Sequence, residues 1–242
     1  MNQNTKDEPC NSFETILTQL RSGQPQLVVG KHEHPIRCLS WSPDDTLLAS
    51  CDSEFLARKD GTVKVWDLRA GCLLWERVIH PTGGCRAVAF SPEGTRLATV
   101  GIDSRNPSNG KPTSTLGVWD ARSGEALSSV TLTGSSLESV AWHADGGRLV
   151  TGDSWGSARM WAANTGEELR VFHVPYTKQP WRGTTPHGNQ HMSAVGFNRN
   201  GTRLATSTSD GPVHLWEPDS GQQVQCLESK TSIYSPQVSF SP

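Results

Sequence analysis

The feature that most constrains this chain is a set of four marks that recurs four times at fixed spacings. Each unit has an aromatic residue, a Ser or Thr nine residues later, a Trp further on, and a Gly five residues after that Trp. The four units are Trp41, Ser50, Trp66 and Gly71; Phe90, Thr99, Trp119 and Gly124; Trp142, Thr151, Trp161 and Gly166; and Phe197, Thr206, Trp216 and Gly221. Such a period indicates a chain built from similar small units.

The apolar runs between the marks alternate with period two, as in Thr62–Trp66, where Val63 and Val65 share a face. Turn-forming residues follow the first run of each unit: Pro43-Asp44-Asp45, Pro92-Glu93-Gly94, Asp145-Gly146-Gly147 and Asn200-Gly201. Each unit therefore predicts four short strands, named a to d here, joined as an antiparallel meander.

The length of the unit varies only in two of its connections. From the Ser or Thr to the Trp there are sixteen, twenty, ten and ten residues, whereas the other spacings inside each unit are constant. The interval from Gly to the next aromatic residue also varies. These variable stretches are the b–c and d–a connections, which lie at the same end of a meander. The sequence thus predicts one face with short turns and one with long loops.

Three of the strand-c endings carry a family resemblance: VKVWDLRAG at Val63–Gly71, GVWDARSG at Gly117–Gly124, and HLWEPDSG at His214–Gly221. From about Gly23 onward the chain resembles the WD40-repeat β-propellers. The resemblance implies an all-β propeller of four complete four-stranded blades over residues 23–242. It also implies a role as a rigid scaffold that binds other proteins.

The resemblance further implies a buried network of His, Ser or Thr, Asp and Trp in each blade. The matching positions are His32, Ser50, Asp60 and Trp66 in the first unit, and His187, Thr206, Asp210 and Trp216 in the fourth. The second unit offers His80 and Trp119, and in the third Thr133 and Trp155 stand where His and Asp would. Because buried polar groups need hydrogen-bond partners, we expect these residues to stabilise the fold and not to be catalytic.

The sequence near both ends of the chain predicts incomplete blades. Gln237–Pro242 (QVSFSP) matches strand a of a fifth unit, and Gln24–Gly30 (QPQLVVG) matches a strand d with no strands a to c before it. Since the family usually closes with seven blades, we expect further blades of the chain's own protein to be needed for ring closure. Residues 1–22 form a leader with a predicted short helix at Ser12–Arg21; the alternative is a degenerate strand c with Thr18 in the Trp position.

One string matches a catalytic pattern: Gly152-Asp153-Ser154-Trp155-Gly156 has the form G-x-S-x-G. In hydrolases that pattern joins a strand to a helix, whereas here it joins strand b to strand c. His187 and His191 lie in a Pro- and Gly-containing stretch without a third ligand, so no metal is expected. No phosphate-binding glycine motif is present. We therefore expect no catalytic residue, no metal and no cofactor.

Three insertions on the predicted loop face are the candidate partner-binding segments: Cys51–Lys59, Gly101–Ser114 and Val174–Gln190. Their aromatic and basic residues are the predicted contacts, namely Phe55, Arg58, Arg105, Tyr176, Trp181 and Arg182. Tyr, Trp and Arg often anchor interfaces. Their positive excess favours an acidic protein or peptide. The alternative is a set of solvated loops, with Trp181 lying on a neighbouring blade.

The remaining composition excludes several classes of partner. A net charge of −2 provides no broad basic surface for nucleic acid or anionic lipid. The polar start favours neither a secretory signal nor a membrane span. We therefore expect a cytoplasmic, non-enzymatic protein-interaction scaffold that binds through its b–c/d–a face. The alternatives are the sensor portion of a larger signalling protein fused to a kinase or ATPase, or a propeller enzyme.

Overall fold

The computed structural model describes residues 31–53, 60–80, 83–103, 113–174, 192–208 and 212–227. These residues form sixteen strands and no helix. The strands are β1 (Ile36–Trp41), β2 (Leu47–Asp52), β3 (Gly61–Asp67), β4 (Cys72–His80), β5 (Cys85–Phe90), β6 (Arg96–Asp103), β7 (Thr113–Asp120), β8 (Ala126–Thr133), β9 (Leu137–Trp142), β10 (Arg148–Asp153), β11 (Ser157–Ala162), β12 (Glu168–His173), β13 (Met192–Phe197), β14 (Leu204–Thr208), β15 (Val213–Trp216) and β16 (Gln223–Leu227).

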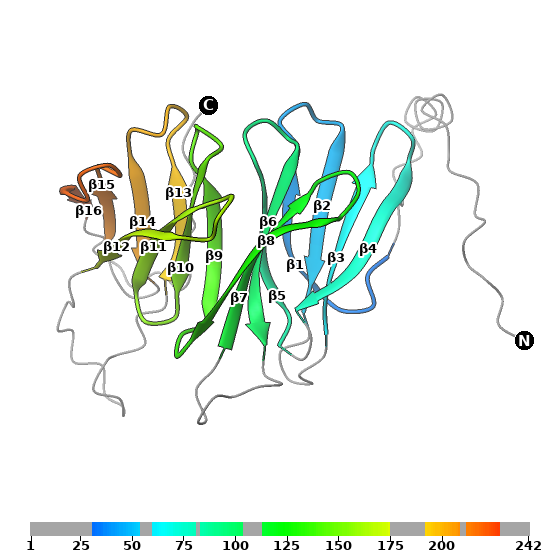
Figure 1. The fold of residues 1–242 in the computed structure, drawn as a ribbon, viewed down its shortest axis with the longest axis horizontal. Coiled ribbons are helices and arrows are strands. Elements are labelled where there is room, and N and C mark those ends of the chain that lie inside the picture. Colours follow the sequence, from blue (N-terminus) through cyan, green and yellow to red (C-terminus); the bar gives the residue numbers. More distant parts are fainter. Residues whose placement is uncertain are drawn as a thin grey trace, which may run out of the picture.

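The strands form four antiparallel four-stranded sheets, each made of four consecutive strands. The first sheet is β1–β4, the second β5–β8, the third β9–β12 and the fourth β13–β16. Figure 1 shows them side by side as an open arc, with the turns that follow β1, β5, β9 and β13 at the upper rim. This confirms the prediction of four all-β units in meander order. The predicted helix at Ser12–Arg21 and the predicted strands at Gln24–Gly30 and Gln237–Pro242 lie outside the described residues.

The a–b turns repeat one backbone conformation. In the first sheet the amide of Ser42 donates to the carbonyl of Leu47 at 2.9 Å, and Asp45 has a φ of 57°. The same turn position is occupied by Gly in the other three sheets, with φ values from 66° to 74°. Asp tolerates this left-handed region better than most residues because its short polar side chain bonds locally. The turn residues of the sequence therefore fix the first hairpin of every sheet.

The c–d turns use the Gly that follows each Trp. Gly166, for example, has a φ of 72°, and its amide donates to the carbonyl of Ala162 at 2.8 Å. A Cβ at Gly166 would lie 2.4 Å from Cγ2 of Val130, on the outer strand of the preceding sheet. The fixed Trp-to-Gly spacing thus meets two needs at once, a left-handed turn and a close approach between sheets.

The hydrophobic core lies between consecutive sheets rather than within one layer. One face of the first sheet, with Val63 and Val65, packs on Val88 of the second, and the same arrangement recurs between the second and third and between the third and fourth. Cys51 and Cys85 are wholly buried free thiols in the first of these contacts. Burial raises the pKa of the Cys85 thiol well above its usual value, so this side chain acts as a neutral apolar filler.

Indole hydrogen bonds tie neighbouring sheets together. Trp75 on β4 donates to the carbonyl of Ala121, and Trp142 on β9 donates to the carbonyl of Ala89 on β5, each at 2.9 Å. These bonds satisfy the one polar atom of each ring where it is buried. The sheets are therefore held in register as well as packed.

Candidate partner-binding face

The face of interest is the rim where strands b end and strands c begin, together with the segment that leads into each strand a. We call this rim the loop face. In the first sheet it is formed by residues 31–35, by Asp52 and Ser53 at the end of β2, and by Asp60 and Gly61 at the start of β3. Antiparallel pairing brings these three stretches to the same end of the sheet.

The contact residues predicted on the three insertions lie outside the described residues: Phe55, Arg58, Arg105, Tyr176, Trp181 and Arg182. The same holds for His187 and Asp210 of the fourth predicted network. Their assignment stays a prediction. The described part of the loop face belongs mainly to the first and third sheets.

In the first sheet, His32, Ser50 and Trp66 come together as expected. Nε2 of His32 lies 2.6 Å from Oγ of Ser50, and the Trp66 indole donates to the same Oγ at 2.8 Å. The carboxylate of the group is that of Asp52, whose Oδ2 lies 2.9 Å from Nδ1 of His32. All four side chains are nearly or wholly buried.

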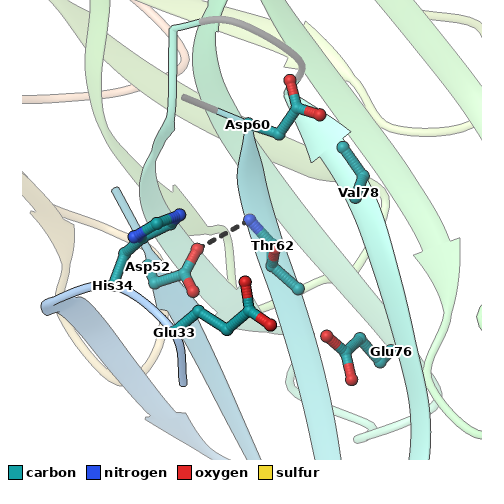
Figure 2. A pocket seen from close by; sticks show the side chains of 7 residues that line it. All are labelled: Glu33, His34, Asp52, Asp60, Thr62, Glu76 and Val78. Carbon is teal, nitrogen blue, oxygen red and sulfur yellow. Dashed lines mark hydrogen bonds between the residues drawn. The ribbon is translucent and has the colours of Figure 1, made fainter. Parts of the chain in front are cut away.

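The carboxylate that contacts the His32 ring is that of Asp52, which the sequence analysis did not select, and the assignment of Asp60 to the network stays a prediction. Asp52 lies two residues after Ser50 on β2, so period-two alternation points both side chains to the same face. The predicted insertion Cys51–Lys59 begins too early, because Cys51 and Asp52 are the last two residues of β2, and residues 53–59 separate Asp60 from that strand. The other oxygen of Asp52 accepts the amide of Thr62 at 2.8 Å, as Figure 2 shows, and so joins the ends of β2 and β3.

The other sheets contain parts of the same arrangement. In the second, Thr99 Oγ1 lies 3.2 Å from Nε2 of His80 and accepts the Trp119 indole at 3.0 Å. In the third and fourth sheets the Trp donates to the strand-b Thr at 2.9 Å, from Trp161 to Thr151 and from Trp216 to Thr206. These side chains stabilise the interior of each sheet, and the hydrogen bond from Trp to Thr is common to the second, third and fourth sheets.

The G-x-S-x-G string of the third sheet forms the turn between β10 and β11. Oδ1 of Asp153 accepts the amides of Trp155 and Ser157, both at 2.9 Å. The hydroxyl of Ser154 accepts the amide of Ser136 at 3.2 Å. The string therefore connects strand to strand, as predicted, and its Ser is bound to backbone at the rim of a hairpin.

Asp153 occupies the same place as Asp52, two residues after the strand-b Ser or Thr. Sequence reasoning missed both, although the recurrence of Ser50-x-Asp52 and Thr151-x-Asp153 was a usable signal. The predicted residues Asp60 and Asp210 instead share their distance to the following Trp, which is six residues in both units. That distance changes whenever residues are inserted between strands b and c.

A cavity of about 430 Å³ opens on the loop face of the first sheet. Its lining residues come from four separate stretches: Glu33, His34, Asp52, Asp60, Thr62, Glu76 and Val78. In Figure 2, Glu33 and His34 lie on one side, Glu76 and Val78 lie on the other along β4, and Asp60 lies at one end. The cavity is thus formed where the segment before β1 passes over the sheet.

The lining is rich in carboxylates. Of the four acidic residues, Asp52 is tied to His32 and Thr62, whereas the Glu76 side chain is 45% exposed. Glu76 lies 3.2 Å from Nζ of Lys64, and that ammonium group also donates to the carbonyl of Lys31 at 2.7 Å. Lys64 is thus paired with Glu76, and the four acidic residues of the lining favour a positively charged group in the cavity.

Within the described ranges, no three His, Cys, Asp or Glu side chains are grouped so that they could hold a metal ion. The same part of the chain contains no helix of the length and apolarity that a membrane span needs.

Comparison with known proteins relates the repeats to one family. The family described as "WD domain, G-beta repeat" matches residues 23–67 and 127–162. COMPASS component SWD3 of Saccharomyces cerevisiae is 25% identical over 221 residues, which cover 89% of this chain and 63% of that protein. The guanine nucleotide-binding protein subunit beta of Solanum tuberosum is 28% identical over 155 residues, which cover 60% of this chain and 38% of that protein.

A third relative is much longer than this chain. Telomerase protein component 1 of Mus musculus is 24% identical over 210 residues, which cover 81% of this chain but 7% of that protein. The matched segments therefore span less than two thirds of each relative. The two matched regions fall on the first sheet and on the stretch from β8 to β11. Two regions of the chain match WD40 repeats, and in the part that the structure describes the four antiparallel four-stranded sheets have the architecture of WD40 propeller blades, arranged as an open arc.

Proposed function

We propose that this chain is a non-enzymatic scaffold that binds a protein or peptide through its loop face, and that the cavity of the first sheet accepts a basic side chain of that partner. Binding of protein partners is a general role of WD40 repeats. The observation that supports the site is the set of carboxylates from Glu33, Asp60 and Glu76 around one cavity.

The physical basis of this proposal is an acidic cavity whose walls are held in place by the first sheet. Asp52 links the ends of β2 and β3 through the Thr62 amide, and Lys64 holds the segment before β1 through the Lys31 carbonyl. The cavity walls are thus positioned before a partner arrives, so binding loses little conformational entropy. A lysine or arginine entering the cavity gains from carboxylates that are partly shielded from water.

The acidic lining differs from the positive excess predicted for the three insertions. Both can serve one partner, because the strands that precede and follow each insertion end at the rim on which the cavity opens. In that case the partner carries a basic residue for the cavity and acidic residues nearby. Electrostatic pairing of this kind sets specificity and association rate more than affinity.

The test is quantitative affinity purification from cells that express the tagged chain, with and without charge changes in the cavity. The site variant is Glu33→Lys with Glu76→Gln, which leaves Asp52 and the buried network intact. The matched control is Glu125→Lys with Glu167→Gln, which makes the same charge change in the c–d turns on the opposite face.

We expect one set of co-purified proteins to be reduced by about tenfold or more in the site variant and unchanged in the control. A salt titration should weaken the same contacts, since exposed charges are screened. Equal recovery of all proteins from both variants, at matched thermal stability, would refute a role for the cavity.

A further inference from the structure

The outer strand of each sheet has one edge that no other described strand covers. Each sheet has its four strands in consecutive order, so the outer strands are β4, β8, β12 and β16, and each pairs with the strand before it. In the part of the chain that the structure describes, residues 126–133 of β8 make no backbone hydrogen bond outside that pairing. The outer edge of β8 therefore presents N–H and C=O groups that can pair with a further strand.

β8 lacks the charges that usually protect such an edge. β4 contains Glu76 and Arg77, and β12 contains Glu168 and Arg170. The eight residues of β8, ALSSVTLT at Ala126–Thr133, include no charged residue and no proline. β16 is also uncharged, but it has five residues. Because natural edge strands usually carry charges, proline or a bulge that prevents further pairing, β8 is the described outer strand best suited to accept another strand.

Most of β8 is also regular. Ser128–Thr133 pair with β7 in continuous register, and the irregularity in this pairing precedes them. Three residues of this stretch are β-branched, which favours an extended backbone in a sheet. Exposure alternates along the stretch, with Ser129, Thr131 and Thr133 exposed and Ser128, Val130 and Leu132 half-buried. The second half of β8 thus offers a straight edge with one exposed face.

The other face of β8 is held by the third sheet. The hydroxyl of Ser128 donates to the carbonyl of Ala163 at 2.7 Å, and Val130 and Leu132 pack against the buried cluster between the second and third sheets. Since side chains alternate along a strand, Ser129 points away from that contact. The backbone of β8 is therefore fixed before any further strand arrives, so pairing loses little conformational entropy on this side.

We propose that β8 pairs antiparallel with β8 of a second copy of this chain, around a two-fold axis perpendicular to the sheet. The second sheets of the two copies then form one continuous sheet. An axis at Val130 sets this residue opposite itself and sets Ser129 opposite Thr131 of the second copy, and cross-strand hydroxyl pairs of this kind stabilise a sheet. The contact lies on the outer side of the second sheet, so it is independent of the partner binding proposed for the loop face.

Charge favours β8 as its own partner over the other outer strands. Pairing of β8 with β4 or β12 of another copy would set charged side chains such as Glu76 or Arg170 beside an uncharged strand, where they lose water without gaining a partner. Self-pairing of β8 places no charge at the contact. A two-fold contact uses the same edge in both copies, so it closes as a dimer. Its small area makes the dimer weak and dependent on concentration.

Sedimentation velocity of the full chain from about 1 to about 200 µM tests this inference in the range where small interfaces assemble. One site variant is Ser129→Lys with Thr131→Lys, and the other is Ser129→Asp with Thr131→Asp. The matched control is Gln223→Lys with Gln225→Lys, which introduces the same charges at two exposed positions of β16. Melting curves establish that each variant is folded. Hydrogen exchange of the wild type gives a second readout, since the β8 amides should exchange more slowly at high concentration while those of β4 and β12 do not change.

We expect the wild type and the control to form dimers as the concentration rises, and each site variant to raise the dissociation constant by about tenfold or more, because like charges then lie opposite each other. An equimolar mixture of the Lys and Asp variants should restore the dimer, since opposite charges face each other in it. A wild type that stays monomeric at the highest concentration would overturn the inference. So would a dimer that both site variants leave unchanged, a mixture that stays monomeric, or species that grow beyond the dimer.

Discussion

The substitution Gly166→Ala tests how the sheets are joined, because two independent effects oppose a side chain there. Gly166 has a φ of 72°, and an L residue in the left-handed region costs about 1–2 kcal/mol. The new Cβ would also lie 2.4 Å from Cγ2 of Val130 in the preceding sheet, and overpacking of this kind costs about 1–3 kcal/mol. The loss of chain entropy in the unfolded state returns about 0.4–1 kcal/mol.

We therefore expect Gly166→Ala to lower the free energy of unfolding by about 3 kcal/mol, or the melting temperature by about 6–12 °C for a domain of this size. Urea unfolding followed by Trp fluorescence measures it. Gly147→Ala in the same sheet is the control, since Gly147 is outside the left-handed region and its Cβ would have no neighbour closer than 3.7 Å. That variant should be neutral or slightly stabilised.

A double-mutant cycle separates the two effects. Val130→Ala removes the atom that the new Cβ meets, so Gly166→Ala should destabilise a Val130→Ala background by about 1 kcal/mol less than it destabilises the wild type. The backbone effect should remain in both backgrounds. Equal stability of Gly166→Ala and Gly147→Ala, or no coupling to Val130, would refute the idea that the c–d turn and the preceding sheet are in close contact.

Two further predictions concern buried and charged hydrogen bonds. Ser50→Ala should lower the free energy of unfolding by about 2–4 kcal/mol, roughly twice the effect of Thr151→Val. The reason is that the Ser50 hydroxyl is hydrogen-bonded to both His32 and Trp66, whereas the Thr151 hydroxyl is hydrogen-bonded to Trp161. Equal effects of the two substitutions in urea unfolding would contradict this. The hydrogen bond from Arg148 lowers the pKa of Asp219, and a lowered carboxyl pKa adds stability that is present above about pH 4 and lost as the pH falls. The urea concentration at the midpoint of unfolding should therefore fall between about pH 5 and pH 2, and it should fall less in the Arg148→Ala variant. If the midpoint changes with pH in the same way in both proteins, the Arg148–Asp219 pair makes no contribution.

The strands and short turns could be predicted because local chemistry determines them. The turn residues after each strand a and the Gly after each Trp fix the hairpins, whatever the rest of the chain does. Asp52 could not be predicted because it falls inside the predicted insertion Cys51–Lys59, whereas Cys51 and Asp52 are the last two residues of β2. A spacing measured across an insertion carries no information on which carboxylate reaches the imidazole.

The cavity could not be predicted because its walls are distant in the sequence. Glu33, Asp60 and Glu76 belong to three separate stretches, and each one alone resembles an ordinary solvated charge. The exposure of Trp41 could not be predicted for a different reason. Trp41 has the same kind of residue pattern around it as Trp142, so the sequence predicts burial for both, and only the arrangement of the sheets distinguishes them.

In the part of the chain that the structure describes, each of the three clusters of buried residues joins two consecutive sheets, so the first and fourth sheets contribute to one cluster each and the second and third sheets to two. In such a linear array, opening starts at the ends and propagates inward. Amide hydrogens of β5–β12 should therefore exchange with solvent more slowly than those of β1–β4 and β13–β16. A mechanical pull on the two ends of the described arc would, by the same reasoning, peel off the end sheets one at a time.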